Sequence, residues 1–164
     1  MMARWIRLGA IEPAEFELGT TRLASVQGRA AAPALLWAQA PTQYLFALVA
    51  PKKFAPGRAS RWLAWALAPA IATYRQFGLA AYLDDEAICL HGRRIAGSQV
   101  RTINECAVIV SSFLAHFPKH CAPTPSRELE EAFRLRLEAQ HGWQFDTSWP
   151  TEDERNFSQV PSFS

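Results

Sequence analysis

Lysine is scarce in this sequence of 164 residues, although basic residues as a class are not. Arginine supplies 14 of the 17 basic side chains, and the lysines are Lys52, Lys53 and Lys119. A lysine can lose its proton and act as a nucleophile, whereas arginine stays protonated in proteins. The composition therefore leaves few amines for covalent chemistry, and with so much alanine it is typical of a GC-rich genome.

Paired cysteines, long apolar runs and an excess of charge are also absent. Cys89, Cys106 and Cys121 form no CxxC pair, which excludes the usual zinc and disulfide frameworks, and no histidine spacing predicts a metal site. A net charge of +2 is too small to indicate nucleic-acid binding. Pro41 and Pro69 interrupt the two most apolar regions, so neither predicts a membrane span, and the N-terminus lacks a signal-peptide core. We expect a reduced, cytoplasmic protein.

Local patterns predict a single α/β or α+β domain over residues 1–157 and a frayed tail over 158–164. Helices are expected at 13–27, 60–77 and 125–141, and strands at 4–8 (an edge strand), 34–40, 43–50 and 105–117. Short strands turning at Asp84–Asp85 and at Gly92 should lie between the second helix and the last strand. Pro69 should kink the second helix or start a new one, and Thr151 and Glu154 match a capping box.

The stretch HGRRIAGSQ, residues 91–99, stands out because it places two adjacent cations at a tight turn. One interpretation is a solvated turn in which Arg93 and Arg94 pair with Asp84, Asp85 or Glu86. The other is a binding site in which Arg94 lies in a cleft and binds a carboxylate, carbonyl or phosphate oxygen. The residues alone leave both open.

The segment ICLHGRRIAGSQ, residues 88–99, resembles the motif v-x-G-R-K-I-A-G-S of the biotin/lipoate ligase superfamily, and within it the lipoate–protein ligases and octanoyltransferases. The order of the flanking segments is also similar, over roughly residues 59–157. The resemblance implies an α/β domain with a mixed β-sheet flanked by helices. It also implies a ligand-binding segment made of Arg93, Arg94, Ile95, Ala96, Gly97 and Ser98.

The ligases of that superfamily activate lipoate or octanoate with ATP and pass it to a lysine of a carrier domain. The transferases take octanoate from an acyl carrier protein through a cysteine thioester. This sequence departs from both at the motif lysine, which falls on Arg94. It also lacks the arginine-plus-triple-glycine loop of the ligases, because no two of its eight glycines are adjacent. Without such a loop, backbone N–H groups have no evident way to converge on a phosphate.

Cys121 lies roughly where the octanoyltransferases have their nucleophile, and the neighbouring Lys119 and His120 could lower its pKa. Ala122 follows it in place of the transferases' glycine, however, which favours an incidental loop thiol over a nucleophile. Cys89 and Cys106 are expected in the core, as are Trp62 and Trp65, while Trp37 is a candidate for lining an acyl pocket.

Three functions remain open at this point. The first is a divergent, non-ligating protein that binds a lipoyl-, octanoyl- or biotinyl-type ligand, or the carrier domain or acyl carrier protein that bears one. The second is an acyltransferase with Cys121 as nucleophile and Arg94 steadying the oxyanion. The third is a structural, partner-binding subunit with no small ligand, and a partner chain could also supply the missing glycine-rich loop. No tightly bound cofactor is evident, and no nucleic-acid or membrane partner is expected.

Overall fold

The computed structural model describes residues 1–27, 32–116 and 126–148, and a six-stranded mixed sheet lies at its centre. Its strands are β1 (Met2–Ala10), β2 (Ala34–Gln39), β3 (Gln43–Pro51), β7 (Gln99–Ile103), β8 (Cys106–Leu114) and β9 (Gln144–Ser148). They lie in the order β7-β8-β3-β2-β1-β9. β1 runs parallel to β2 and β9, and the other neighbours are antiparallel. The predicted α/β class with a mixed sheet is confirmed.

The first strand is not an edge strand, and the prediction for residues 4–8 is wrong in this respect. β1 is flanked by β2 on one side and by β9 on the other. The pairing of Trp5 with Leu35 and with Thr147 brings together segments far apart in the chain. Such a non-local partner leaves no mark on the local sequence, which is why the strand appears to be an edge.

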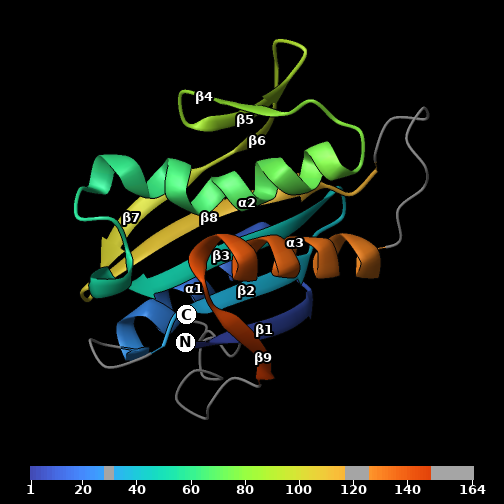
Figure 1. Cartoon of the computed structure of the whole chain (residues 1–164). Coiled ribbons are helices and arrows are strands. Elements are labelled where there is room, and N and C mark those ends of the chain that lie inside the picture. The colour runs from blue at the N-terminus through green and yellow to red at the C-terminus, as the bar shows by residue number, and fades with distance from the viewer. Residues whose placement is uncertain (28–31, 117–125, 149–164) are drawn as a thin grey trace.

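A second, three-stranded antiparallel sheet projects beyond the first (Figure 1). It consists of β4 (Tyr82–Asp84), β5 (Ala87–Leu90) and β6 (Arg93–Gly97), with the turns where the sequence predicts them. His91 and Gly92 form the β5–β6 turn with φ angles of 52° and 76°. The backbone N–H of Gly92 donates to the hydroxyl of Tyr82 at 3.1 Å, which fastens the turn to β4.

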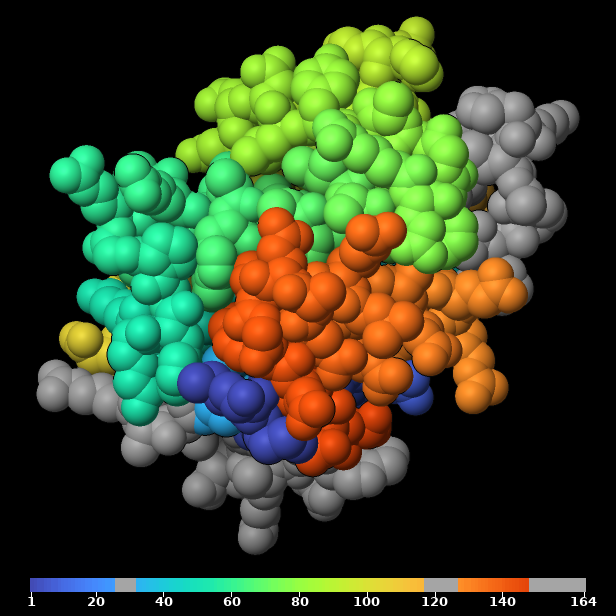
Figure 2. All heavy atoms as spheres, in the orientation of Figure 1, coloured from blue at the N-terminus to red at the C-terminus, as the bar shows by residue number. Residues whose placement is uncertain are grey.

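Helices cover both faces of the large sheet (Figure 1). α1 (Pro13–Gln27) packs on one face, and α2 (Trp62–Gln76) and α3 (Ser126–His141) cover the other, where their side chains form a continuous layer (Figure 2). α2 continues through Pro69, so no new helix begins there. Two 3-10 turns, η1 (Lys52–Phe54) and η2 (Ala59–Arg61), join β3 to α2. Among the described residues, no helix is long and apolar enough to cross a membrane.

Aromatic rings fill the space between the sheet and α3. Phe46, Phe113 and Phe133 have ring centroids 4.7 to 5.4 Å apart. Trp37, the candidate for lining an acyl pocket, is buried in the same core and stacks on Tyr44. As predicted, the buried face of α3 consists of Leu129, Ala132, Phe133 and Leu137.

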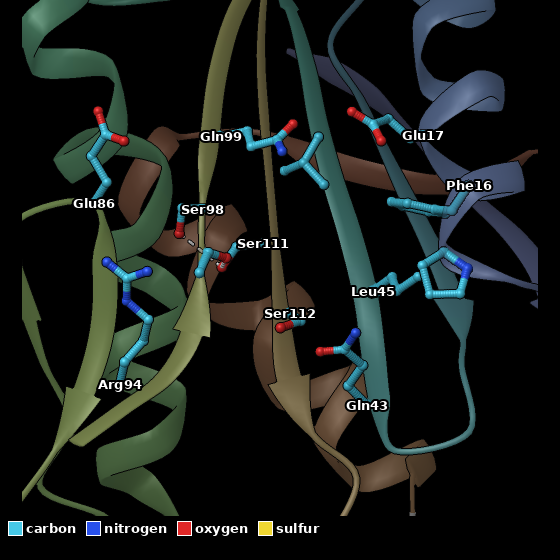
Figure 3. Close-up of a pocket in the computed structure, with 13 residues that line it drawn as sticks. Phe16, Glu17, Gln43, Leu45, Glu86, Arg94, Ser98, Gln99, Ser111 and Ser112 are labelled. Carbon is cyan, nitrogen blue, oxygen red and sulfur yellow. Dashed lines mark hydrogen bonds between the residues drawn. The ribbon is translucent and has the colours of Figure 1, made fainter.

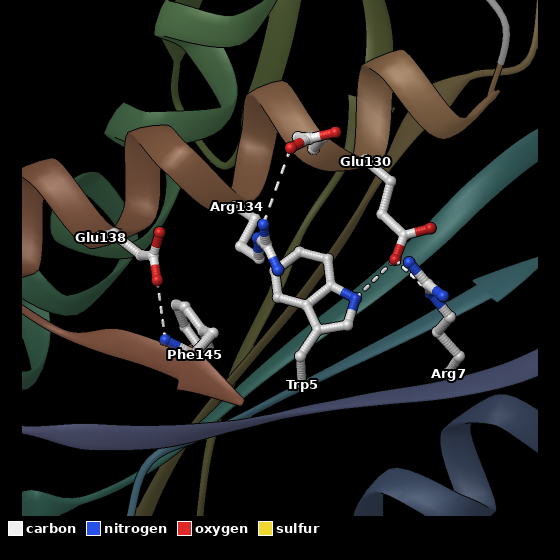
Figure 4. Close-up of polar contacts among 7 residues, drawn as sticks. Trp5, Arg7, Glu130, Arg134, Glu138 and Phe145 are labelled. Atoms are coloured by element: carbon white, nitrogen blue, oxygen red, sulfur yellow. Dashed lines mark hydrogen bonds and ion pairs between the residues drawn. The ribbon is translucent and has the colours of Figure 1, made fainter. Parts of the chain in front are cut away.

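Polar contacts fix the position of α3 on the sheet (Figure 4). The indole N–H of Trp5, which is 1% exposed, donates to Glu130 Oε2 at 2.7 Å. Arg7 Nε donates to the same oxygen at 2.6 Å. The backbone N–H of Phe145 donates to Glu138 Oε2 at 2.8 Å. Both carboxylates lie on α3, so their hydrogen bonds connect this helix to β1 and β9.

Candidate functional site

A cavity of about 450 Å³ opens where the small sheet meets the α1 face of the large one. The small sheet supplies one wall and α1 the other, and strands β3, β7 and β8 form the floor between them (Figure 3). The lining side chains with charged or polar ends are Glu17, Gln43, Glu86, Arg94, Ser98, Gln99, Ser111 and Ser112. Pro13, Phe16, Leu45 and Val110 supply apolar surface.

Half of the predicted ligand-binding segment lines this cavity. Arg94, Gly97 and Ser98 are on its wall. The other half of the segment does not line it. Arg93 is exposed and Ile95 is half-buried. The register of β6 with β5 shifts between Ile88 and Cys89, and Ala96, opposite Ile88, lies in the core at 4% exposure.

Arg94 faces the cavity without an ion-pair partner in residues 1–27, 32–116 and 126–148. Glu86 also lines the cavity on this wall, but no ion pair joins it to Arg94 (Figure 3). Within the same residues, neither Asp84 nor Asp85 pairs with Arg93 or Arg94, as a solvated turn would require. The guanidinium therefore keeps its donors available for an anion in the cavity.

The junction of Gly97 and Ser98 is fixed to the large sheet by two hydrogen bonds. Ser98 Oγ donates to Ser111 Oγ at 3.0 Å, and Ser111 Oγ donates to the backbone oxygen of Gly97 at 3.1 Å. Ser111 lies on β8 and is 3% exposed. The wall that carries Arg94 is thus tied to the floor of the cavity.

The sequence analysis missed the polar residues of the floor. Gln43 on β3, Gln99 on β7 and Ser112 on β8 all lie on the α1 side of the large sheet. A signal was present, because Ser111 and Ser112 interrupt an otherwise apolar strand that is buried in the sheet. A pair of hydroxyls in such a strand indicates either internal hydrogen bonds or a polar cavity.

The cysteine candidates are either outside the described residues or buried in the core. Cys121, with Lys119 and His120, lies outside the described residues. Cys89 and Cys106 are buried, as expected of core residues, and burial raises the pKa of the Cys106 thiol. In the part of the chain that the structure describes, no three His, Cys, Asp or Glu side chains are grouped as a metal site.

No family model and no curated protein matches the sequence, but solved structures match the fold closely. A chain from the bipartite lipoate protein ligase of Thermoplasma acidophilum, solved with its E2 lipoyl domain, superposes with a TM-score of 0.80 at 9% identity, over 97% of this chain and 91% of that one. The T. acidophilum protein Ta0514 with bound lipoic acid superposes with a TM-score of 0.78 at 11% identity, over 97% of this chain and 94% of that one. The chain has the biotin/lipoate ligase fold.

The biotin branch of this fold is more distant. The biotin protein ligase of Leishmania major in complex with biotinyl-5-AMP gives a TM-score of 0.57 at 11% identity, over 96% of this chain and 80% of that one. Arg94 lies in β6, at the end of the small sheet that lines the cavity. Residues 52–61, between β3 and α2, contain the two 3-10 turns and a single glycine, Gly57.

Proposed function

We propose that the protein binds a lipoyl-, octanoyl- or biotinyl-type carboxylic acid in the cavity at Arg94, and that it does not perform ATP-dependent ligation. The observation that carries the proposal is the guanidinium of Arg94, which faces the cavity with no ion-pair partner in the described ranges. A planar guanidinium can bind a carboxylate through two parallel N–H donors. The ligand's carboxylate is therefore assigned to Arg94.

The shape of the cavity suits the rest of such a ligand. Its volume of about 450 Å³ falls in the range of small-molecule sites. Phe16 and Leu45 offer apolar surface for methylene groups across from the Arg94 wall (Figure 3). The related structures with lipoic acid and with biotinyl-5-AMP support an acyl ligand of this class.

The loss of ligation is inferred from two features of this chain. Arg94 keeps a positive charge, but its fork is longer and differently shaped than an ammonium group, so it does not replace lysine in holding reacting oxygens. Residues 52–61 contain one glycine and so offer no evident cradle of backbone N–H groups for a triphosphate. A carrier domain that bears the acyl group is the partner we propose, by analogy with the structure solved with its E2 lipoyl domain.

A thermal-shift series with octanoate, lipoate and biotin on wild type, Arg94→Ala and Arg93→Ala tests the proposal. A ligand at a hundred times its Kd stabilises the folded state by about 2.7 kcal/mol, which raises Tm by roughly 5–10 °C in a domain of this size. Arg93→Ala is the matched control, because Arg93 is exposed and does not line the cavity.

We expect a shift in wild type and Arg93→Ala that disappears in Arg94→Ala. The Cys121→Ala variant should show the same ligand-induced rise in Tm as wild type if the protein binds the acid without acyl transfer. The absence of a shift with all three acids would refute the proposal and favour a partner-binding subunit.

A further inference from the structure

The floor of the cavity is more polar than a hydrocarbon chain requires. Gln43, Gln99 and Ser112 come from three neighbouring strands and lie on the same face of the sheet. Ser112 is opposite Leu45 in the register of β8 with β3 and is only 6% exposed. A ligand resting on this floor meets two amides and a hydroxyl beside the apolar side chain of Leu45.

These three polar groups have no protein partner within residues 1–27, 32–116 and 126–148. By contrast, the hydroxyls of Ser98 and Ser111 are engaged with each other and with Gly97. A buried hydroxyl covered by a hydrocarbon loses its water and gains no bond, which is unfavourable. The same hydroxyl covered by a hydrogen-bonding ligand regains a partner.

The charges around the cavity lead to the same conclusion. Arg94 is the cation on its wall, whereas Glu17 and Glu86 contribute two carboxylates. Glu17 forms an ion pair with Arg101, in which Oε1 lies 3.5 Å from Nη1. Glu86 has no ion pair among the described residues. A carboxylate that faces a ligand accepts N–H donors and disfavours an apolar group in its place.

We infer that the site selects a carboxylic acid whose body carries hydrogen-bonding groups of the amide or ureido class, in preference to a saturated acyl chain or a dithiolane. The inference rests on the proposed function and narrows it. Arg94 binds the carboxylate, Phe16 and Leu45 cover the methylene portion, and the floor residues with Glu86 bind the N–H and C=O groups.

Isothermal titration calorimetry with biotin, octanoate and lipoate as probes tests the inference, since biotin is an acid with a ureido group and the other two lack one. We expect wild-type protein to bind biotin at least about tenfold more tightly than octanoate or lipoate. Ser112→Ala and Gln43→Met should each weaken the binding of biotin by roughly 3- to 10-fold, as the loss of one neutral hydrogen bond does. The affinity for octanoate should stay unchanged or increase.

Ser25→Ala is the matched control, because this exposed serine on α1 bonds only to Thr21 of its own helix through its hydroxyl. It should bind all three acids as wild type does. The inference would be overturned if octanoate or lipoate bound as tightly as biotin, or if the floor variants weakened the binding of all three acids equally. Either result would leave the proposed function standing. Failure of all three acids to bind would refute the proposed function itself.

Discussion

His141, at the end of α3, has its imidazole packed against two indole rings that also contact each other. Its ring centroid is 4.6 Å from that of Trp65 and 4.8 Å from that of Trp143. Nε2 is buried and finds no hydrogen-bond partner among the described residues. Burial lowers the pKa of His141 from 6.5 to about 4, so the ring is neutral at physiological pH. The attraction of two aromatic faces for a cation does not offset the cost of burying the charge.

This histidine should make the protein less stable in acid. Between pH 6.5 and pH 4 the unfolded chain binds a proton at His141 that the folded chain does not, so the free energy of unfolding falls as the pH falls through this window. We expect a loss of roughly 2–3 kcal/mol from this group between pH 7 and pH 4. Urea unfolding of wild type and His141→Gln across this range measures it, and equal slopes for the two proteins would contradict the assignment.

The helices and strands that the sequence predicts correctly are those with a strong local pattern. α1 occupies the predicted range 13–27, and β2 and β3 follow their predicted strands as an antiparallel pair. β7 and β9 were missed because each is five residues long, mostly polar, and held by pairing with β8 or β1. Their existence depends on tertiary partners, which overrule weak local preference.

The candidate site was predictable only along the motif. Arg94 was singled out because its charge and its resemblance to a known segment are visible in the sequence. Glu86 and Gln43 could not be assigned to the same cavity, since only the packing of the small sheet against the large one places them together. Whether the motif binds a ligand remains a prediction.

The β5–β6 turn needs a residue that tolerates positive φ. Gly92 has φ +76°, and an added Cβ would meet no atom within 4 Å, so only backbone strain opposes a side chain there. Gly92→Ala should cost about 1 kcal/mol of stability. Gly57→Ala is the matched control, with equal space and no positive φ, and chemical denaturation should find it close to wild type. Similar losses in both variants would contradict the role of φ.

At the scale of the whole molecule, the two sheets are coupled through the hydrogen bonds of Ser111 to Ser98 and Gly97. Ser111→Ala removes both bonds and should cost about 1–3 kcal/mol. We expect the amide protons of β5 and β6 to exchange about tenfold faster, with those of β2 and β3 unchanged.

Ser112→Ala is the matched control, because its hydroxyl has no partner among the described residues and its loss should change stability by less than about 0.5 kcal/mol. Uniform acceleration across both sheets would show that the small sheet does not open on its own.

The side chains that line the cavity also decide what cannot react inside it. Among the described residues that line it there is neither an amine nor a thiol. A thioester or mixed anhydride held there would meet a guanidinium, which does not become acylated near neutral pH, and serine hydroxyls that make no hydrogen bond to a carboxylate or imidazole among the described residues. The described part of the cavity wall is therefore inert toward self-modification, and an acceptor of an activated acyl group is not among these lining residues.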